Sequence, residues 1–219
     1  MLSCIASLSD VQVLPVLFKH MRDAAETIGA QSYVHENGFF KMVLAKSGGY
    51  ALRLHHFCLE SKDDIHSHRW NFVSSMLSGE YTHTLFDEVT PARDTDNSLY
   101  QKNLYSPTHN TDGSTTYNLV KQYDCDLKYI SVRDFKKGNC YFMPFELKHA
   151  VVVKNPCLTL IITAISESPT CLLYRQRRFI SPPVNKPVPL SRIQICERLG
   201  IIKELLRLVP LLYVDIPIK

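Results

Sequence analysis

The chain has 219 residues, of which 45% are hydrophobic and 21% charged, and it carries a formal net charge of +4. This size and composition suit a single globular domain with an ordinary core. The small basic excess forms no stripe with interleaved aromatic residues, and no apolar run is long enough for a transmembrane helix. The sequence therefore argues against nucleic-acid and membrane partners.

Cysteine usage indicates the compartment. There are seven cysteines, an odd number, and none forms a CxxC pair. A chain of this length with such cysteines is expected to keep free thiols in a reducing environment. The first residues also lack the charged and apolar regions of a signal peptide. We therefore expect a cytoplasmic protein.

Helical spacing appears near the two ends of the chain. Val11, Leu14, Leu17, Met21 and Ala25 recur at helical intervals and predict an N-terminal helix over residues 9–29. A Pro-rich connector at 180–190 is followed by a predicted helix over 191–209, which Ser191 can cap. The apolar stripe expected on that helix comprises Ile193, Cys196, Leu199, Ile202, Leu205 and Leu206. It would pack on the protein's own core, or, as the alternative, form a homodimer contact.

The middle of the chain reads as short strands bounded by turn residues. Strands are expected over 38–45, 50–59, 70–77, 80–86, 117–122, 127–133, 140–144, 149–154 and 158–165. Many short strands without helices between them indicate an antiparallel sandwich or barrel. The polar stretch 87–116 is expected to be a long loop at one end of that barrel.

A histidine pair marks the candidate site. His66 and His68 are two residues apart, so in a strand their imidazoles share one face and can bind one metal ion. Trp70 and Phe72 would continue this face as an apolar wall. Two surface histidines would show the same spacing, so the pair needs support from elsewhere in the sequence.

A second segment supplies this support. Gly138, Pro144 and His149 follow the spacing G-x5-P-x-G-x2-H, except that Glu146 replaces the second glycine. Together with the HxH pair and the later Gly79, this segment resembles the cupin superfamily over residues 48–165. The resemblance implies a mainly β fold, a cupin-type double-stranded β-helix or jelly-roll barrel, over 36–178. It implies a single domain over 1–219, with an α-helix at each end.

The resemblance also implies a metal site made of His66, His68 and His149. Most cupins add a glutamate shortly after the HxH pair, but Phe72 and Val73 stand there and cannot bind a metal. Three imidazoles leave coordination positions open for substrate. Fe(II) is the expected ion, although imidazole ligands also accept Zn, Ni, Mn or Cu.

Within the superfamily, the pattern resembles the three-histidine thiol dioxygenases of the cysteine dioxygenase type. The shared features are the HxH pair without a carboxylate and the stretch from Gly79 to Asp87. The resemblance implies a mononuclear non-haem iron dioxygenase, an oxidoreductase that takes dioxygen and a small molecule, with thiols as one candidate class. His66, His68 and His149 would then be its catalytic residues.

Several further side chains are candidates for contact with the substrate. Arg53 could bind a carboxylate through its planar guanidinium group, and His83 could support the metal ligands or join them. The full predicted substrate-binding set is Arg53, Trp70, Phe72, His83, Tyr141 and Met143. The other histidines, His20, His35, His55, His56 and His109, are expected to be solvent-exposed or packing residues.

Which face of its strand Arg53 lies on decides whether it can contact a substrate in the barrel. In a regular strand Arg53 and His55 share one face, while Leu52, Leu54 and His56 share the other. The apolar face would be expected to form the barrel core, which would turn Arg53 outward to an ion pair.

Two other functions stay open at this stage. One is a different metal-dependent cupin enzyme, an isomerase, lyase or hydrolase, in which the ion polarises a carbonyl or activates water. The other is a binding or effector protein that uses a cupin barrel without catalysis.

Overall fold

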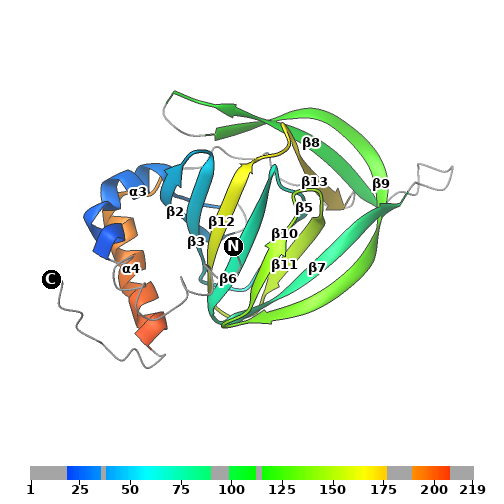
Figure 1. The fold of residues 1–219 in the computed structure, drawn as a ribbon. Helices are drawn as coiled ribbons and strands as arrows, with labels where there is room; N and C mark the ends of the chain where they lie inside the picture. The colour runs from blue at the N-terminus through cyan, green and yellow to red at the C-terminus, as the bar shows by residue number, and fades with distance from the viewer. Residues whose placement is uncertain (1–18, 36–37, 90–98, 112–114, 177–188, 208–219) are drawn as a thin grey trace.

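A computed structural model describes residues 19–35, 38–89, 99–111, 115–176 and 189–207 as two antiparallel sheets and two helices (Figure 1). The first sheet contains, in spatial order, β1 (Tyr33–Val34), β2 (Phe40–Ser47), β3 (Tyr50–Phe57), β12 (Cys157–Ser166), β6 (Trp70–Ser78) and β10 (Cys140–Met143). The second contains β4 (Ser61–Lys62), β11 (Lys148–Val153), β5 (Ile65–His66), β13 (Cys171–Gln176), β8 (Tyr100–His109), β9 (Thr115–Lys136) and β7 (Glu80–Val89). The helices are α3 (Ala25–Gln31) and α4 (Arg192–Arg207).

The chain crosses repeatedly between the two sheets. Strand β5 belongs to the second sheet, β6 to the first and β7 to the second, and β10, β11, β12 and β13 alternate in the same way. This wrapping of one ribbon around two facing sheets is a jelly roll. The prediction of a mainly β jelly-roll fold with flanking helices is therefore confirmed.

Strand β11 is enclosed on both sides by other strands. It pairs with β5 and β4 along one edge and with β7 along the other. Because every strand from β5 through β13, β8 and β9 to β7 is also paired in turn, the second sheet closes on itself. His149 lies in this doubly paired strand, where its backbone has little freedom.

The helices cover the outer face of the first sheet. Figure 1 shows α3 and α4 side by side against β2 and β3. The buried cluster at this contact joins the helix residues Met21, Ala25, Ile28, Ile195, Leu199 and Ile202 to the strand residues Met42, Leu44, Leu54, Leu158 and Leu160. The apolar face of β3 therefore packs outward on helices, and the expectation that this face forms the barrel core was wrong.

The C-terminal helix begins with a reciprocal cap. The Ser191 hydroxyl accepts the Gln194 N–H at 3.2 Å, and the Gln194 side-chain oxygen accepts the Ser191 N–H at 2.9 Å. The helix packs on the sheet as expected, but through Ile195, Leu199 and Ile202, whereas Ile193 is 71% exposed. The predicted stripe was thus rotated by part of a turn.

The helix boundaries follow the predictions closely where they can be compared. The described helical residues at the N-terminus run from Lys19 to Gln31 with a turn at Ala24, two residues past the predicted end. Predicted helical residues 9–18 and 208–209 lie outside the described residues, as do 180–188 of the Pro-rich connector. Neither described helix has the length and hydropathy needed to cross a bilayer.

The stretch 87–116 is not a loop throughout, which corrects the sequence analysis. It contains the end of β7, all of β8 and the start of β9, while residues 90–98 and 112–114 lie outside the described ranges. The two strands predicted at 117–122 and 127–133 are parts of the single strand β9. Most of β9 is exposed, so its sequence lacks the alternation that marks a half-buried strand.

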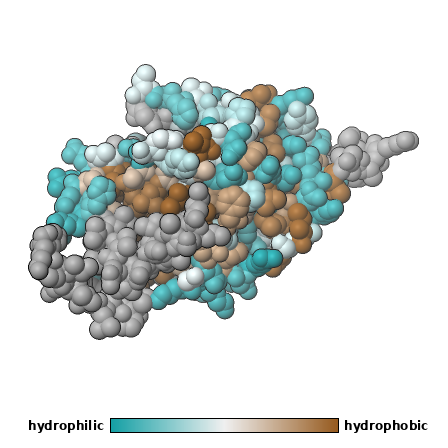
Figure 2. Space-filling model, viewed as in Figure 1, coloured by the Kyte–Doolittle hydropathy of each residue, from teal (hydrophilic) through white to brown (hydrophobic). Residues whose placement is uncertain are grey.

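Apolar side chains also reach the outer surface of the second sheet. Large exposed residues of β9 include Leu119, Val120, Tyr129, Ile130 and Val132. Figure 2 shows apolar patches among hydrophilic residues over the part of the molecule where β7 and β9 run.

Candidate metal centre

Two of the three predicted ligands face each other across neighbouring strands. His66 of β5 and His149 of β11 are direct partners in the antiparallel register. Such partners have Cβ atoms about 4.5–5.5 Å apart. Their ring centroids accordingly lie 4.5 Å apart.

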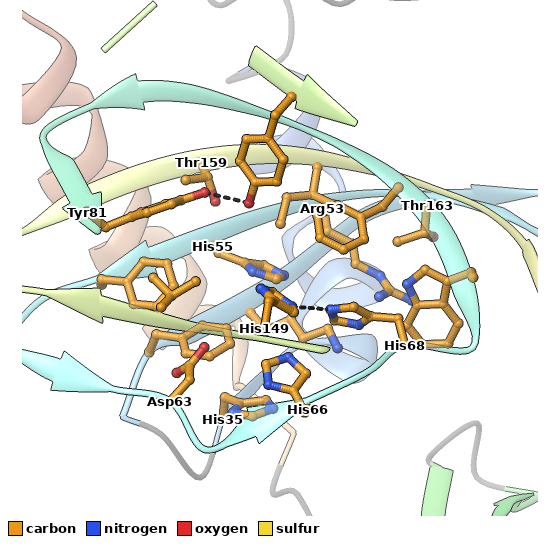
Figure 3. A pocket seen from close by; sticks show the side chains of 18 residues that line it. His35, Arg53, His55, Asp63, His66, His68, Tyr81, His149, Thr159 and Thr163 are labelled. Carbon is orange, nitrogen blue, oxygen red and sulfur yellow. Dashed lines mark hydrogen bonds between the residues drawn. The ribbon is translucent and has the colours of Figure 1, made fainter. Parts of the chain in front are cut away.

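His68 approaches the same point from the crossing between the sheets. Strand β5 ends at His66, and the chain passes through Ser67, His68 and Arg69 before β6 begins. The His68 N–H donates to the Phe145 carbonyl at 3.2 Å, which anchors the crossing beside the turn before β11. Nε2 of His68 lies 2.8 Å from Nε2 of His149, and Figure 3 shows the two rings turned toward each other.

The trio fits a single metal ion. One ring nitrogen from each of His66, His68 and His149 lies within 4.8 Å of the others, and this is the only such group of three among the described residues. Nitrogens that share an ion at about 2.0–2.1 Å are about 3–3.4 Å apart. Small ring movements would therefore suffice to bind an ion between them.

The protonation of the trio also suits metal binding. Nδ1 of His66 is 2.8 Å from the Asp64 carbonyl, which can only accept, so Nδ1 carries a proton and Nε2 is the nitrogen left to face a metal. Burial, followed by the neighbouring histidines, holds the pKa values of His68 and His149 well below their usual range. Neutral imidazole is the form that binds metals.

His83 supports the site from behind. Its Nε2 lies 2.6 Å from Nδ1 of His149. If His149 binds a metal through Nε2, its Nδ1 carries a proton and donates to His83, which orients the imidazole. Burial lowers the pKa of His83 to about 4, so it is neutral and can accept. His83 does not line the cavity, and its contact with His149 gives it the position of a group that supports the metal ligands.

The three imidazoles line a cavity of about 100 Å³ between the two sheets. Of the predicted substrate-binding residues, Arg53, Trp70, Phe72 and Tyr141 also line it. Met143 does not: it is buried against Phe72 and Ile161 in the wall behind the cavity. At the far end the Tyr81 and Tyr141 hydroxyls are 2.7 Å apart and hydrogen-bonded.

Other cavity residues were missed from the sequence. His35, Lys41, His55 and Asp63 line the cavity (Figure 3 labels all but Lys41). His55 alternates with Arg53 along β3, so a correct assignment of the faces of that strand would have found it. His35 and Asp63 lie in short connections, where no periodic pattern could show their direction. Burial lowers the pKa of His35 to about 3 and that of His55 well below its usual range.

Comparison with known proteins adds little beyond the fold. No protein-family model and no curated protein matches the sequence. Solved structures with a similar arrangement include an RmlC-like cupin from Shewanella frigidimarina, 13% identical, covering 65% of this chain and 91% of that one with a TM-score of 0.38. A cupin superfamily protein from Desulfitobacterium hafniense is 17% identical, covering 60% and 82%, with a TM-score of 0.34.

Metal-associated enzymes occur among these structures as well. A hydroquinone 1,2-dioxygenase in complex with Cd²⁺ and 4-hydroxybenzonitrile is 12% identical, covering 57% of this chain and 63% of that one, with a TM-score of 0.36. Similarities this distant carry no argument about activity. The function has to be argued from the residues of the cavity.

Proposed function

We propose that this chain is a mononuclear metal enzyme, a non-haem iron dioxygenase that binds Fe(II) through His66, His68 and His149 and acts on a small organic molecule. The observation that supports this most is the convergence of three imidazoles on one wall of a cavity lined by aromatic residues. Such an ion would supply the redox chemistry that dioxygen requires.

The surrounding side chains have complementary tasks. Phe39, Phe57 and Phe72 give the cavity apolar walls, which would limit the access of water and strengthen each polar interaction inside it. The Arg53 guanidinium and the Tyr141 hydroxyl are two of the polar groups in the lining that would orient a substrate against the histidines. Because the cavity is small, only the reacting end of a substrate would enter it.

Thiols are the first substrate class to test, because three histidines without a carboxylate resemble the thiol dioxygenases. The expected reaction adds dioxygen to sulfur. The six described cysteines are free, and a reducing cytoplasm is the compartment that we propose for the protein.

Elemental analysis of the purified chain, produced without added metal, is the first experiment. We expect about one iron per chain, followed by oxygen consumption with one or more members of a panel of small thiols and non-thiol acids. His149→Ala should lose the metal, because it removes one of the three ligands. His20→Ala is the matched control, since His20 is exposed and far from the trio in the sequence.

The alternatives give different results. Stoichiometric zinc without oxygen consumption would favour a redox-neutral metal enzyme such as a hydrolase, lyase or isomerase. Full metal content in His149→Ala would contradict the ligand set. A wild-type chain that binds no divalent ion would contradict the proposal as a whole and favour a binding protein.

A further inference from the structure

A larger groove adjoins the histidine cavity. It has a volume of about 660 Å³, in the range typical of small-molecule sites. Lys41, Arg53, Trp70 and Thr163 line both hollows, so the two share a wall. His109, Thr115 and Tyr117, from the part of the β8–β9 hairpin near its tip, also line the groove.

The charge lining this groove is of one sign. Lys41, Lys46, Arg53 and Arg69 line it, and none of its described lining residues is an aspartate or glutamate. Lys102, Lys128, Lys136 and Arg175, which form ion pairs with nearby carboxylates, all lie outside the groove. Burial and the neighbouring cations lower the pKa values of Lys41 and Arg53. Gathering basic groups in a groove that no carboxylate lines costs free energy, which a bound anion would recover.

Two guanidinium groups are arranged for such an anion. Arg53 and Arg69 lie over the Trp70 ring, with their central carbons 4.7 Å and 5.0 Å from its centroid. The Nε atoms of both are buried and have no hydrogen-bond partner among the described residues. A buried donor without an acceptor is costly, and a guanidinium group pairs best with the two oxygens of a carboxylate or phosphate.

The groove and the histidine trio are physically connected. Arg69 directly follows His68 in the crossing from β5 to β6, and it lines the groove together with Tyr117 of the hairpin. The ring of Trp70 lies 6.3 Å from the ring of His68. An anionic group held by Arg53 and Arg69 would therefore lie next to the entrance of the cavity.

We propose that the groove binds the anionic end of the substrate, an organic phosphate or polycarboxylate, through Arg53, Arg69 and Lys41 while the reacting end enters the histidine cavity. This inference rests on the proposed function and narrows its substrate class. The shared chemistry is an oxyanion with more than one negative charge, because four basic side chains and no carboxylate line the groove.

Trp70 allows a direct test, since it is the only tryptophan of the chain. The full-length protein is titrated with inorganic phosphate and, separately, with succinate, and tryptophan fluorescence is recorded. We expect a saturable change with at least one anion, with an apparent affinity that falls as sodium chloride is added. Saturation by phosphate alone identifies a phosphate substrate, and saturation by succinate alone identifies a carboxylate.

Variants distinguish specific binding by the two guanidinium groups from a general effect of positive charge on anion binding. Arg69→Gln should weaken binding by about tenfold, the loss of one charge-assisted hydrogen bond. Arg69→Lys should recover part of it, because lysine keeps the charge but not the planar fork. Lys46→Gln at the exposed rim should weaken binding less, and Arg133→Gln, an exposed arginine on β9 away from the groove, should change nothing.

The outcomes keep this inference distinct from the proposed function. No saturable response to either anion, or responses that Arg53→Gln and Arg69→Gln leave unchanged, would overturn the inference even if the protein contains iron and consumes oxygen. Saturable, arginine-dependent binding in a protein without a metal would support the groove and contradict only the iron enzyme.

Discussion

The hydrogen bond between His83 and His149 allows a sharp test of the metal centre. Replacing His83 with Phe keeps a ring of similar size against Phe135 and Tyr141, whose centroids lie 5.7 Å and 5.3 Å away. The change removes the acceptor that lies 2.6 Å from Nδ1 of His149. The ligand set itself stays complete.

The expected loss follows from the burial of both rings. His149 is 3% exposed, so its Nδ1–H would have no water to replace the lost partner. Groups that hold a metal-binding histidine in this way typically contribute about 10–100-fold in metal affinity, or about 1.4–2.7 kcal/mol. We therefore expect His83→Phe to weaken metal binding within this range, without abolishing it as His149→Ala should.

Competition with a chromogenic chelator would measure the affinity. His83→Gln should restore part of it, because the glutamine carbonyl can accept the same N–H. His56→Phe controls for the loss of a buried imidazole, since His56 is 1% exposed and packs outside the cavity. Equal metal affinity in wild type and His83→Phe would refute the reasoning that His149 binds through Nε2.

Three further predictions concern stability. Gly79→Ala should lower the free energy of unfolding, measured in urea, by well over about 2 kcal/mol, because Gly79 has φ +72° and a Cβ there would lie 2.5 Å from the Pro156 carbonyl oxygen. Gly138→Ala should cost only about 1–2 kcal/mol, because Gly138 has φ +86° but a Cβ there would meet open space. Equal losses in the two variants would contradict this account. Ile195→Ala should cost about 2–5 kcal/mol, because this side chain of α4 is fully buried in the cluster between the helices and the first sheet, whereas Ile193→Ala on the exposed face should cost under about 0.5 kcal/mol. Burial lowers the pKa of His56 from 6.5 to about 4, so between these pH values the unfolded chain binds more protons than the folded chain, and the free energy of unfolding falls as the pH falls. His56→Gln should therefore remove about one proton from the proton uptake on unfolding at about pH 5. An unchanged dependence of the free energy of unfolding on pH would show that His56 titrates normally in the folded protein.

Much of the architecture follows from local patterns in the sequence. Turn glycines and short apolar runs mark most strands, because strand boundaries depend on residues that are neighbours in the chain. The candidate ligands were also visible, since His66, His68 and His149 stand at spacings that a jelly roll brings together. The structure places their imidazoles around one point.

Only the tertiary structure decides which element packs against each face of a strand. Leu52, Leu54 and His56 read as the inner face of β3, but two helices distant in sequence cover that face and leave Arg53 and His55 to the cavity. Burial of a strand face depends on which element packs against it, and no periodicity within the strand encodes this. The same reason explains why Met143 lies behind the wall, why Lys41 joins the cavity, and why only the folded chain shows a cationic groove beside the histidines.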